Sequence, residues 1–207
     1  MEPTAERALP PPLTRAGRRT RGALLRSARG IFEARGYHQT RIGDITAAAG
    51  TSVGTFYTYF DSKEDLFRHL LIDVENEVYG ELRTGAGTAG PAARIRETNR
   101  LYLESFRRNA RFWAVVEEAS LVNEEARRVL TERRAYYHGR AGRAFARWQD
   151  QGLLDATIDI DFAATALGLM TERCAYLWFV LEPRDVDLDA ATEDLTGLWL
   201  AALRLPA

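Results

Sequence analysis

The stretch from Ile42 to Leu66, IGDITAAAGTSVGTFYTYFDSKEDL, decides the fold of this chain. Its apolar residues have the spacing of two short helices, over about 41–48 and 52–60, joined by the tight turn Ala49-Gly50-Thr51-Ser52. The second helix carries small hydroxyl residues and tyrosines where a surface helix normally carries Lys and Glu. Such a surface allows close approach and hydrogen bonding, which a helix needs in order to lie in a DNA groove.

The rest of the chain has helical periodicity as well. One helix is expected from Thr14 or Arg18 to Arg35, where Gly36 ends it. Further helices are expected at about 62–83, 91–109, 111–120, 122–151, 160–181 and 188–204. We therefore predict an all-α fold in three parts: a disordered tail over 1–13, a three-helix helix-turn-helix domain over 14–71, and a larger helical domain over 72–207.

Composition argues against several classes of protein. The single Cys174 and three scattered histidines offer no disulfide framework and no metal-ligand spacing, so no metal site is expected. The sequence has no recognisable nucleophile–base pair and no glycine-rich phosphate loop, which argues against an enzyme and against a bound cofactor. The first thirteen residues contain no apolar signal segment, so a cytoplasmic location is expected.

The segment from Phe162 to Leu181 is apolar enough to raise the question of a membrane span. Glu172 and Arg173 lie near its middle, and each charge would cost about 2.5–3.5 kcal/mol at the centre of a bilayer. A buried helix is therefore expected here, and no membrane partner.

The overall net charge of −1 conceals an uneven distribution. Residues 1–71 carry eleven Lys and Arg against seven Asp and Glu, a balance of +4, whereas residues 72–207 carry seventeen against twenty-two, a balance of −5. A basic front and an acidic back indicate that only the front part meets a polyanion, unless the basic residues form no more than a solvated tail.

The helix after the turn has the residues of a DNA-recognition helix. Ser52 is expected to cap it, and Ser52 and Thr55 have hydroxyls for phosphates or base edges. Gly54 lets the backbone approach the DNA closely, and Val53 offers a methyl group to thymine. Capping alone remains the alternative explanation for any one of these residues.

Two tyrosines and a lysine extend this surface. Tyr57 and Tyr59 are roughly 200° apart around a helix, which favours one contact to each flanking phosphate strand. Lys63 begins the next helix, where its charge opposes the helix dipole unless a phosphate lies opposite. Ordinary packing of the tyrosines is the alternative.

Residues Arg29 to Leu66 resemble the N-terminal DNA-binding domain of the tetracycline-repressor (TetR) family of bacterial regulators. The matching residues are Phe32, Gly36-Tyr37, Thr40, Asp44-Ile45, Ala49-Gly50, Ser52, Gly54-Thr55, Tyr57, Phe60 and Ser62-Lys63-Glu64. The resemblance implies a homodimeric repressor whose front domain binds double-stranded operator DNA and whose back domain binds a small hydrophobic or amphipathic ligand. It implies phosphate contacts from Thr40, Ser52, Tyr57, Tyr59 and Lys63, and approach to the bases by Val53, Gly54 and Thr55.

Three residues depart from the family pattern. Arg41 stands where the family usually has Ser or Thr, so either Thr40 caps the second helix or Arg41 is free to reach a phosphate or guanine. Thr51 replaces a usual valine in the turn, and Val53 replaces a residue that is often basic or polar. These three positions are where a distinct operator preference is expected.

The back part contains many aromatic residues, which fit either an ordinary helical core or an apolar ligand cavity. For the cavity, the candidate lining residues are Tyr102, Phe106, Trp113, Tyr137, Phe145, Trp148, Met170 and Cys174. Glu117, Glu172 and Arg173 are candidate polar groups, because charges on largely apolar helices need partners. Glu172 and Arg173 could equally form salt bridges at a dimer interface.

The last two helices are apolar on more than one face, which is typical of helices that pack against a partner chain. The candidate interface residues are Phe162, Ala166, Leu169, Leu177, Leu181, Leu195, Leu198 and Trp199. The family resemblance implies a four-helix bundle across a two-fold axis, and hence a palindromic operator.

The favoured interpretation is a ligand-responsive transcriptional repressor. A DNA-binding protein without a small-molecule inducer, controlled by a protein partner or acting structurally, is the alternative. An all-α enzyme with a borrowed helix-turn-helix is a third, disfavoured possibility.

Overall fold

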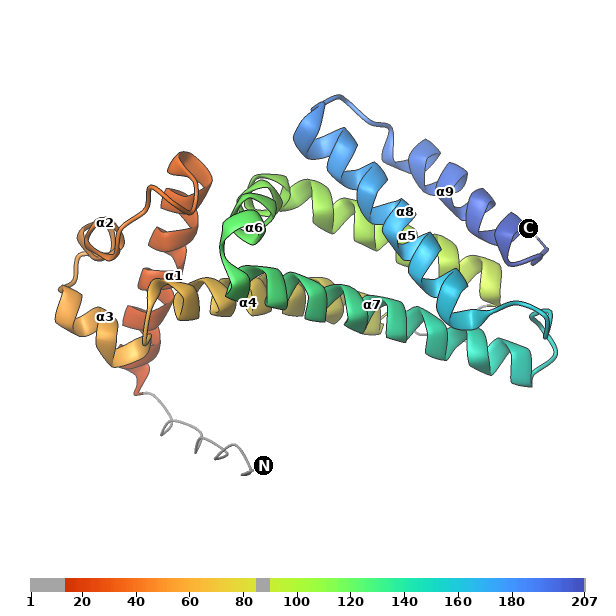
Figure 1. Ribbon diagram of the computed structural model, residues 1–207, viewed down its shortest axis with the longest axis horizontal. Coiled ribbons are helices and arrows are strands. Elements are labelled where there is room, and N and C mark those ends of the chain that lie inside the picture. Colours follow the sequence, from red (N-terminus) through yellow and green to blue (C-terminus); the bar gives the residue numbers. More distant parts are fainter. Residues whose placement is uncertain (1–13, 85–89, 207) are drawn as a thin grey trace.

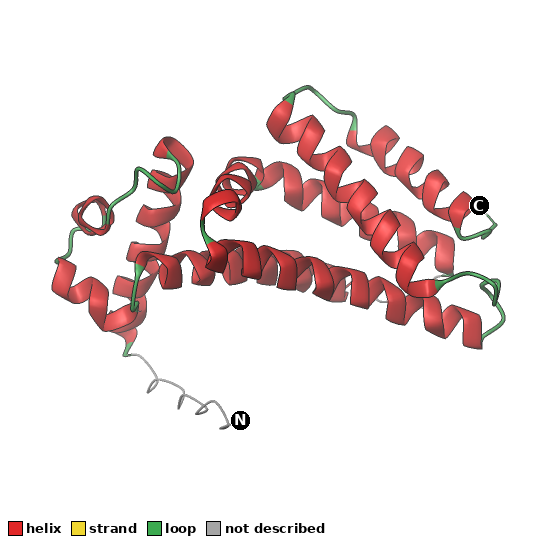
Figure 2. Ribbon diagram, in the orientation of Figure 1, coloured by secondary structure: helices red, strands yellow, loops and turns green. Residues whose placement is uncertain are grey.

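A computed structural model describes residues 14–84 and 90–206; its description of side chains leaves out residues 75–84, 129 and 133. The predicted tail over 1–13 lies outside these residues, as does most of the segment Thr84–Gly90, TGAGTAG. The described part is all-α, as predicted (Figure 2). Its helices are α1 (Arg15–Arg35), α2 (Ile42–Ala48), α3 (Val53–Tyr59), α4 (Lys63–Thr84), α5 (Pro91–Arg108), α6 (Ala110–Val122), α7 (Glu124–Asp150), α8 (Ile160–Tyr176) and α9 (Leu188–Ala202).

The first three helices enclose a small apolar core at one end of the molecule (Figure 1). Phe32 of α1, Ile45 of α2 and Phe56 of α3 are fully buried in it. Gly36 ends α1 with a φ of 81°, in the left-handed region that favours glycine, and the ring of Tyr37 folds back to 5.5 Å from that of Phe32. The stop signals read from the sequence are therefore the ones that the chain uses.

The start of α2 corrects one prediction. Arg41, not Thr40, is the N-cap residue, with an extended backbone and with its N–H donating to Asp44 Oδ2 at 3.0 Å. An arginine side chain has no acceptor, so only the Asp44 half of a capping box forms. Thr40 is buried, and its hydroxyl donates to the carbonyl of Gly36 at 2.8 Å.

The long helix α4 runs from the first three helices into the back part, alongside α7 (Figure 1). The rings of Phe67 on α4 and Phe112 on α6 are 5.8 Å apart, and Phe67 also contacts Phe32 edge-on at 5.5 Å. Apolar packing is therefore continuous across the predicted domain boundary at residue 71.

In the back part, α9 packs along α5 and α8 packs along α7. A second apolar cluster between them includes Ile95, Phe145, Trp148 and Trp199. The predicted helix over 160–181 is α-helical to Tyr176 and then widens into a π-helical turn, Leu177–Leu181. Within the described ranges, no helix is long and apolar enough to cross a membrane.

Candidate nucleic-acid interface and ligand cavity

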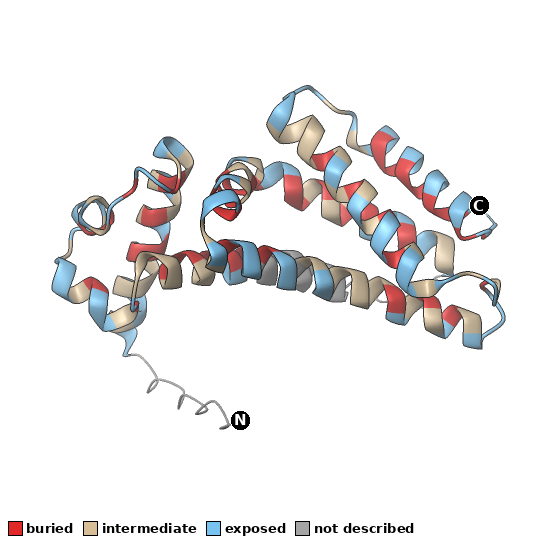
Figure 3. Cartoon of the chain, in the orientation of Figure 1, coloured by how far each residue is buried: buried red, intermediate tan, exposed pale blue. Residues whose placement is uncertain are grey.

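The outer face of α3 has the geometry expected of a recognition helix. Ser52 caps it as predicted: its hydroxyl accepts from the N–H of Thr55 at 3.1 Å, and the two hydroxyls are 2.9 Å apart. Val53 is 45% exposed and Tyr57 is 55% exposed, while Phe56 anchors the opposite face in the core (Figure 3). The exposed side chains near the N-terminus of α3 are therefore available to a groove.

Gly54 lies on the same face. A Cβ added there would find Ser52 Oγ at 3.8 Å as its nearest neighbour, which is ordinary contact. The folded chain therefore has room for a side chain at this position, and α-helical geometry does not require glycine. Because Gly54 has no side chain, the backbone of α3 is accessible to a binding partner at this position.

The remaining predicted residues of this surface divide by burial. Arg41 is exposed at the start of α2, whereas Thr51, Thr55 and Tyr59 are half-buried, with Tyr59 packed against the front core. Exposed arginines at the start of α1 add positive charge to this end of the molecule. They are Arg15, Arg18 and Arg19.

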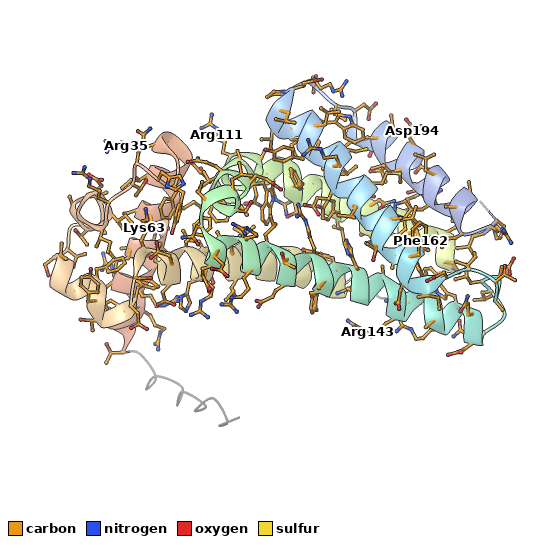
Figure 4. The ribbon with its side chains drawn as sticks, in the orientation of Figure 1. Arg35, Lys63, Arg111, Arg143, Phe162 and Asp194 are labelled. Carbon is orange, nitrogen blue, oxygen red and sulfur yellow. The ribbon has the colours of Figure 1, made fainter. Side chains whose placement is uncertain are left out.

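Lys63 points inward, at the junction of α4 with the first three helices (Figure 4). Its Nζ donates to the carbonyls of Tyr37 at 3.0 Å and Thr40 at 3.1 Å, and it lies 4.2 Å from the centre of the Tyr37 ring. Burial lowers the pKa of Lys63, and the nearby Glu64 carboxylate opposes that change. The carbonyls of the α1–α2 turn thus account for a cation beside the N-terminus of α4 without any phosphate.

Glu64 completes this junction. Its Oε1 accepts from the Tyr37 hydroxyl at 2.8 Å. Burial, together with the Glu64 carboxylate, raises the pKa of Tyr37 well above its ordinary range. Tyr37 is therefore a neutral hydrogen-bond donor that ties the end of α1 to α4.

A cavity of about 310 Å³ lies between α5, α7, α8 and α9. This volume is at the lower end of the range for small-molecule sites. Five of the eleven predicted residues line it: Tyr102, Tyr137, Phe145, Trp148 and Glu172. Trp199, predicted for a dimer interface, also lines it, and its Nε1 donates to Thr171 Oγ1 at 3.0 Å.

A polar cluster closes one part of the cavity wall. Arg134 donates to Glu172 Oε1 through both Nε, at 3.0 Å, and Nη2, at 2.7 Å, and its Nη2 also donates to Glu117 Oε1 at 3.2 Å. Beside it, His138 fills space left by Gly168, where an added Cβ would lie 2.7 Å from the imidazole ring. Burial lowers the pKa of His138; Glu172 opposes this change and Arg134 reinforces it.

The family model of the bacterial regulatory proteins of the tetR family matches residues 24–70, which hold the helix-turn-helix described above. The chain belongs to the TetR family. It is therefore a transcriptional regulator of a non-enzymatic, DNA-binding family.

Relatives resemble this regulator over different lengths. The transcriptional regulator EthR of Mycobacterium tuberculosis is 26% identical over 186 residues, covering 87% of this chain and 85% of EthR. The transcriptional repressor KstR2 of Rhodococcus jostii is 37% identical over 78 residues, covering 36% of this chain and 37% of KstR2. FadR of Bacillus subtilis, whose crystal structure is a complex with stearoyl-CoA, shares the fold with a TM-score of 0.75 at 18% identity, covering 87% of this chain and 98% of FadR.

The other six residues predicted for the cavity of the regulator do not line it. Phe106 and Trp113 stack on each other, 5.8 Å apart, in the front core cluster, and Met170 and Cys174 are half-buried outside the cavity wall. Arg173 is exposed, with its guanidinium 5.0 Å from the Tyr176 ring. Among the described contacts, Glu117 is joined to the cavity wall by its hydrogen bond with Arg134.

Sequence reasoning missed the basic residues of the cavity. Arg94, Arg134, Arg140, Arg143 and Arg147 all line it. A usable signal was present, because residues 135–149 contain three arginines and no acidic residue. A solvated helix surface normally mixes both signs of charge.

The exposed faces of α8, the π-helical turn Leu177–Leu181 and α9 carry five of the eight residues predicted for the dimer interface of the TetR-family chain. Phe162 is 72% exposed and Leu198 is 55% exposed; Ala166, Leu169 and Leu181 are exposed, and Leu177 is half-buried. Leu195 and Trp199 correct the prediction, because they are only 2% and 7% exposed within the single chain. Both side chains are used up in intrachain packing and offer almost no surface to a partner.

Proposed function

We propose that this TetR-family regulator is a ligand-responsive repressor that binds a palindromic operator in the cytoplasm as a homodimer. A small, largely hydrophobic molecule releases it from the DNA. In this proposal residues 14–71 bind DNA, and residues 72–207 bind the ligand and form the dimer.

The observation that carries the ligand-responsive part is the cavity between α5, α7, α8 and α9. Its aromatic side chains, with polar and charged groups in the same wall, are suited to a small-molecule site. The stearoyl-CoA complex of FadR, which has the same fold, gives that function precedent in this architecture.

The surface of α3 supports the DNA-binding part. Tyr57 and Arg41 are exposed and suited to phosphates, whereas Val53, Gly54 and Thr55 lie where bases would be read. Lys63 and Thr40 act in this proposal through the α1–α2 turn that they hold, since their hydrogen bonds are internal.

The uncovered apolar face of α8 and α9 supports the dimer. A two-fold dimer presents two copies of α3, and two copies read two half-sites of a palindrome. A ligand changes DNA affinity only by as much as it prefers the conformation that does not bind DNA.

Footprinting on the DNA upstream of the chain's own gene tests the proposal. We expect a protected palindrome that loses protection when hydrophobic or amphipathic compounds, stearoyl-CoA among them, are added. A palindrome that none of the compounds releases would favour a DNA-binding protein controlled by a protein partner. Protection without any two-fold symmetry would contradict the homodimer.

A further inference from the structure

The charge of the cavity wall is strongly one-sided. Among its lining side chains in the described part of the chain there are five arginines and a single carboxylate, Glu172. That carboxylate is already committed to Arg134 through three contacts of 2.7–3.2 Å. Among the described lining residues, no second carboxylate is present for Arg94, Arg143 and Arg147.

Three of the cavity arginines have no partner among the described residues. Arg94, Arg143 and Arg147 form no ion pair or side-chain hydrogen bond within the described residues. Elsewhere on the same helices, arginines are paired: Arg100 of α5 contacts Glu97 and Glu104. On α7, Arg128 contacts two glutamates in the same way. Among the described side chains, Arg94, Arg143 and Arg147 therefore differ from these paired arginines of the same two helices.

Arg94 has an electrostatically unfavourable position without an anion, whereas Arg147 lies in the last turn of α7, where the helix dipole favours a cation. Arg94 lies in the first turn of α5, which has no acidic residue, so its charge opposes the helix dipole. Arg143 and Arg147 are one turn apart on α7, and Arg143 Nη1 lies 3.4 Å from where a Cβ of Gly139 would stand. Asp161 of α8, near Gly142, makes no ion pair with them among the described contacts.

The apolar part of the wall lies beside these charges. Ile95 follows Arg94 on α5, and Phe145 and Trp148 alternate with Arg143 and Arg147 on α7. Between Arg94 and Tyr102 the α5 side of the cavity extends over roughly 12 Å, at 1.5 Å per residue. The wall thus combines an elongated apolar surface with unpaired guanidinium groups.

We propose that the ligand of this cavity is an amphipathic anion. Its apolar body packs against Ile95, Phe145 and Trp148, and its carboxylate or phosphate is held by Arg94, Arg143 and Arg147. Guanidinium groups bind both kinds of anion through paired, charge-assisted hydrogen bonds. The inference rests on the proposed ligand-responsive function and specifies the chemical class of the ligand.

Calorimetric titration of the full chain with probes that share one alkyl chain tests this inference. The probes are dodecanoate, dodecanoyl-CoA, the neutral dodecanol and the cationic dodecyltrimethylammonium, each kept below its micelle concentration. We expect at least one anion to bind about tenfold or more tightly than dodecanol, the ratio of a single charge-assisted hydrogen bond. Tighter binding of dodecanoate would identify a free carboxylate as the anionic group of the ligand. Tighter binding of dodecanoyl-CoA would identify a phosphate-bearing conjugate.

Charge reversal of the arginines locates the anionic group. The double variant Arg143→Glu/Arg147→Glu is expected to lose this tenfold preference and to bind dodecanol as the parent chain does. Arg111→Glu, an exposed residue of α6 away from the cavity, is the matched control and should keep the preference (Figure 4). Ala144→Phe, which fills the cavity wall, should weaken all the probes alike.

Several results would overturn the inference. One is equal binding of dodecanol and both anions, another is preference for the cation, and a third is an equal effect of the double variant and Arg111→Glu. Failure of the proposed function is separate: an anion that binds in the cavity but does not release a footprinted operator leaves the inference standing and removes the inducer role.

Discussion

Tyr57 is the residue of α3 whose side chain is free to meet a phosphate. It is more than half exposed, whereas the neighbouring Phe56 is anchored in the core. We expect Tyr57→Phe to weaken DNA binding by about tenfold, because a hydrogen bond to a charged group is lost. The loss should be similar on operator and unrelated DNA, with the thermal midpoint unchanged; fluorescence anisotropy and thermal melting measure the two. Unchanged affinity would remove Tyr57 from the phosphate contacts.

Lys63 stabilises the fold at the junction between α4 and the α1–α2 turn. Its Nζ is the donor to two carbonyls of the α1–α2 turn. We expect Lys63→Met to lower the free energy of unfolding by about 1–2 kcal/mol, discounted because the side chain is partly exposed. Urea denaturation without DNA measures this.

Arg41→Met is the control for Lys63→Met, because it removes an exposed cation at the start of α2, near the same turn. Its stability should stay within about 0.5 kcal/mol of the parent chain. A stable Lys63→Met that has lost DNA affinity would restore the phosphate contact inferred from the sequence.

His138 gives the regulator a pH dependence of known sign. Its folded pKa lies below the usual value of about 6.5, chiefly because of burial. As pH falls through 6.5 the unfolded chain takes up the proton first, so stability decreases; above 6.5 both states are neutral and the residue contributes nothing. His138→Gln should therefore lose less stability than the parent chain between pH 7.5 and pH 5.5 in urea titrations. Parallel losses in the two proteins would mean that His138 titrates alike in both states.

At the level of helices, the sequence predicted existence and approximate bounds because the signals are local. Gly36 and Gly50 end α1 and α2 with positive φ, and Ser52 caps α3, each through contacts within a few residues. Membership of the cavity needs the rotation of each helix against distant neighbours. Tyr102 and Phe106 are one turn apart on α5, yet only Tyr102 lines the cavity. A sequence pattern marks both as apolar and does not distinguish their destinations.

The same limit explains the dimer candidates on α9. Leu195 and Leu198 are three residues apart, but Leu195 is buried against the chain's own core and Leu198 faces outward. Excess apolar surface was visible in the sequence. The packing of the helices decides which apolar residues are buried within the chain and which stay exposed. Only the structure shows that packing.

The exposed face of α8 yields a test of dimer formation. Phe162→Asp places a charge where we expect a partner chain to pack. In a two-fold dimer the substitution is present in both protomers, so its effect on the free energy of association is doubled. With about 2 kcal/mol for each buried phenylalanine, the dissociation constant should rise at least about a hundredfold. Sedimentation velocity measures the shift from dimer to monomer. Leu121→Asp on α6, at a residue 78% exposed, is the control and should leave the dimer intact.

For the whole molecule, α6 is the element on which the two ends meet. Phe112 joins the core of the first helices through Phe67, and Arg29 of α1 donates to Asn109 Oδ1 at 2.7 Å, just before α6. The division proposed at residue 71 is therefore not a break in packing. A movement of α6 would be transmitted to α1 and hence to α3.

The cavity reaches α6 through ion pairs. Glu172 holds Arg134, Arg134 holds Glu117, and the next residue, Glu118, has a carboxylate oxygen 2.8 Å from where a Cβ of Gly36 would stand. A ligand that shifts α8 against α7 acts on the first pair of this series. Gly36, the left-handed glycine at the end of α1, lies at the opposite end of this series of contacts.

We therefore expect Glu117→Gln to reduce the coupling between ligand and DNA while leaving each binding site intact. Glu117 does not line the cavity and lies far along the chain from α3, so dodecanoyl-CoA affinity and DNA affinity measured separately should stay close to those of the parent chain. The ratio of DNA affinities without and with saturating dodecanoyl-CoA should fall by a factor of about 2 to 30, the range found for residues that carry coupling. Glu132→Gln, an exposed acid of α7 paired only with Arg128 among the described contacts, is the control and should keep the full ratio. Because coupling is reciprocal, operator DNA should weaken dodecanoyl-CoA binding by the same reduced factor in Glu117→Gln. An undiminished ratio would show that the Arg134–Glu117 ion pair does not carry the coupling between the cavity and the DNA-binding helices.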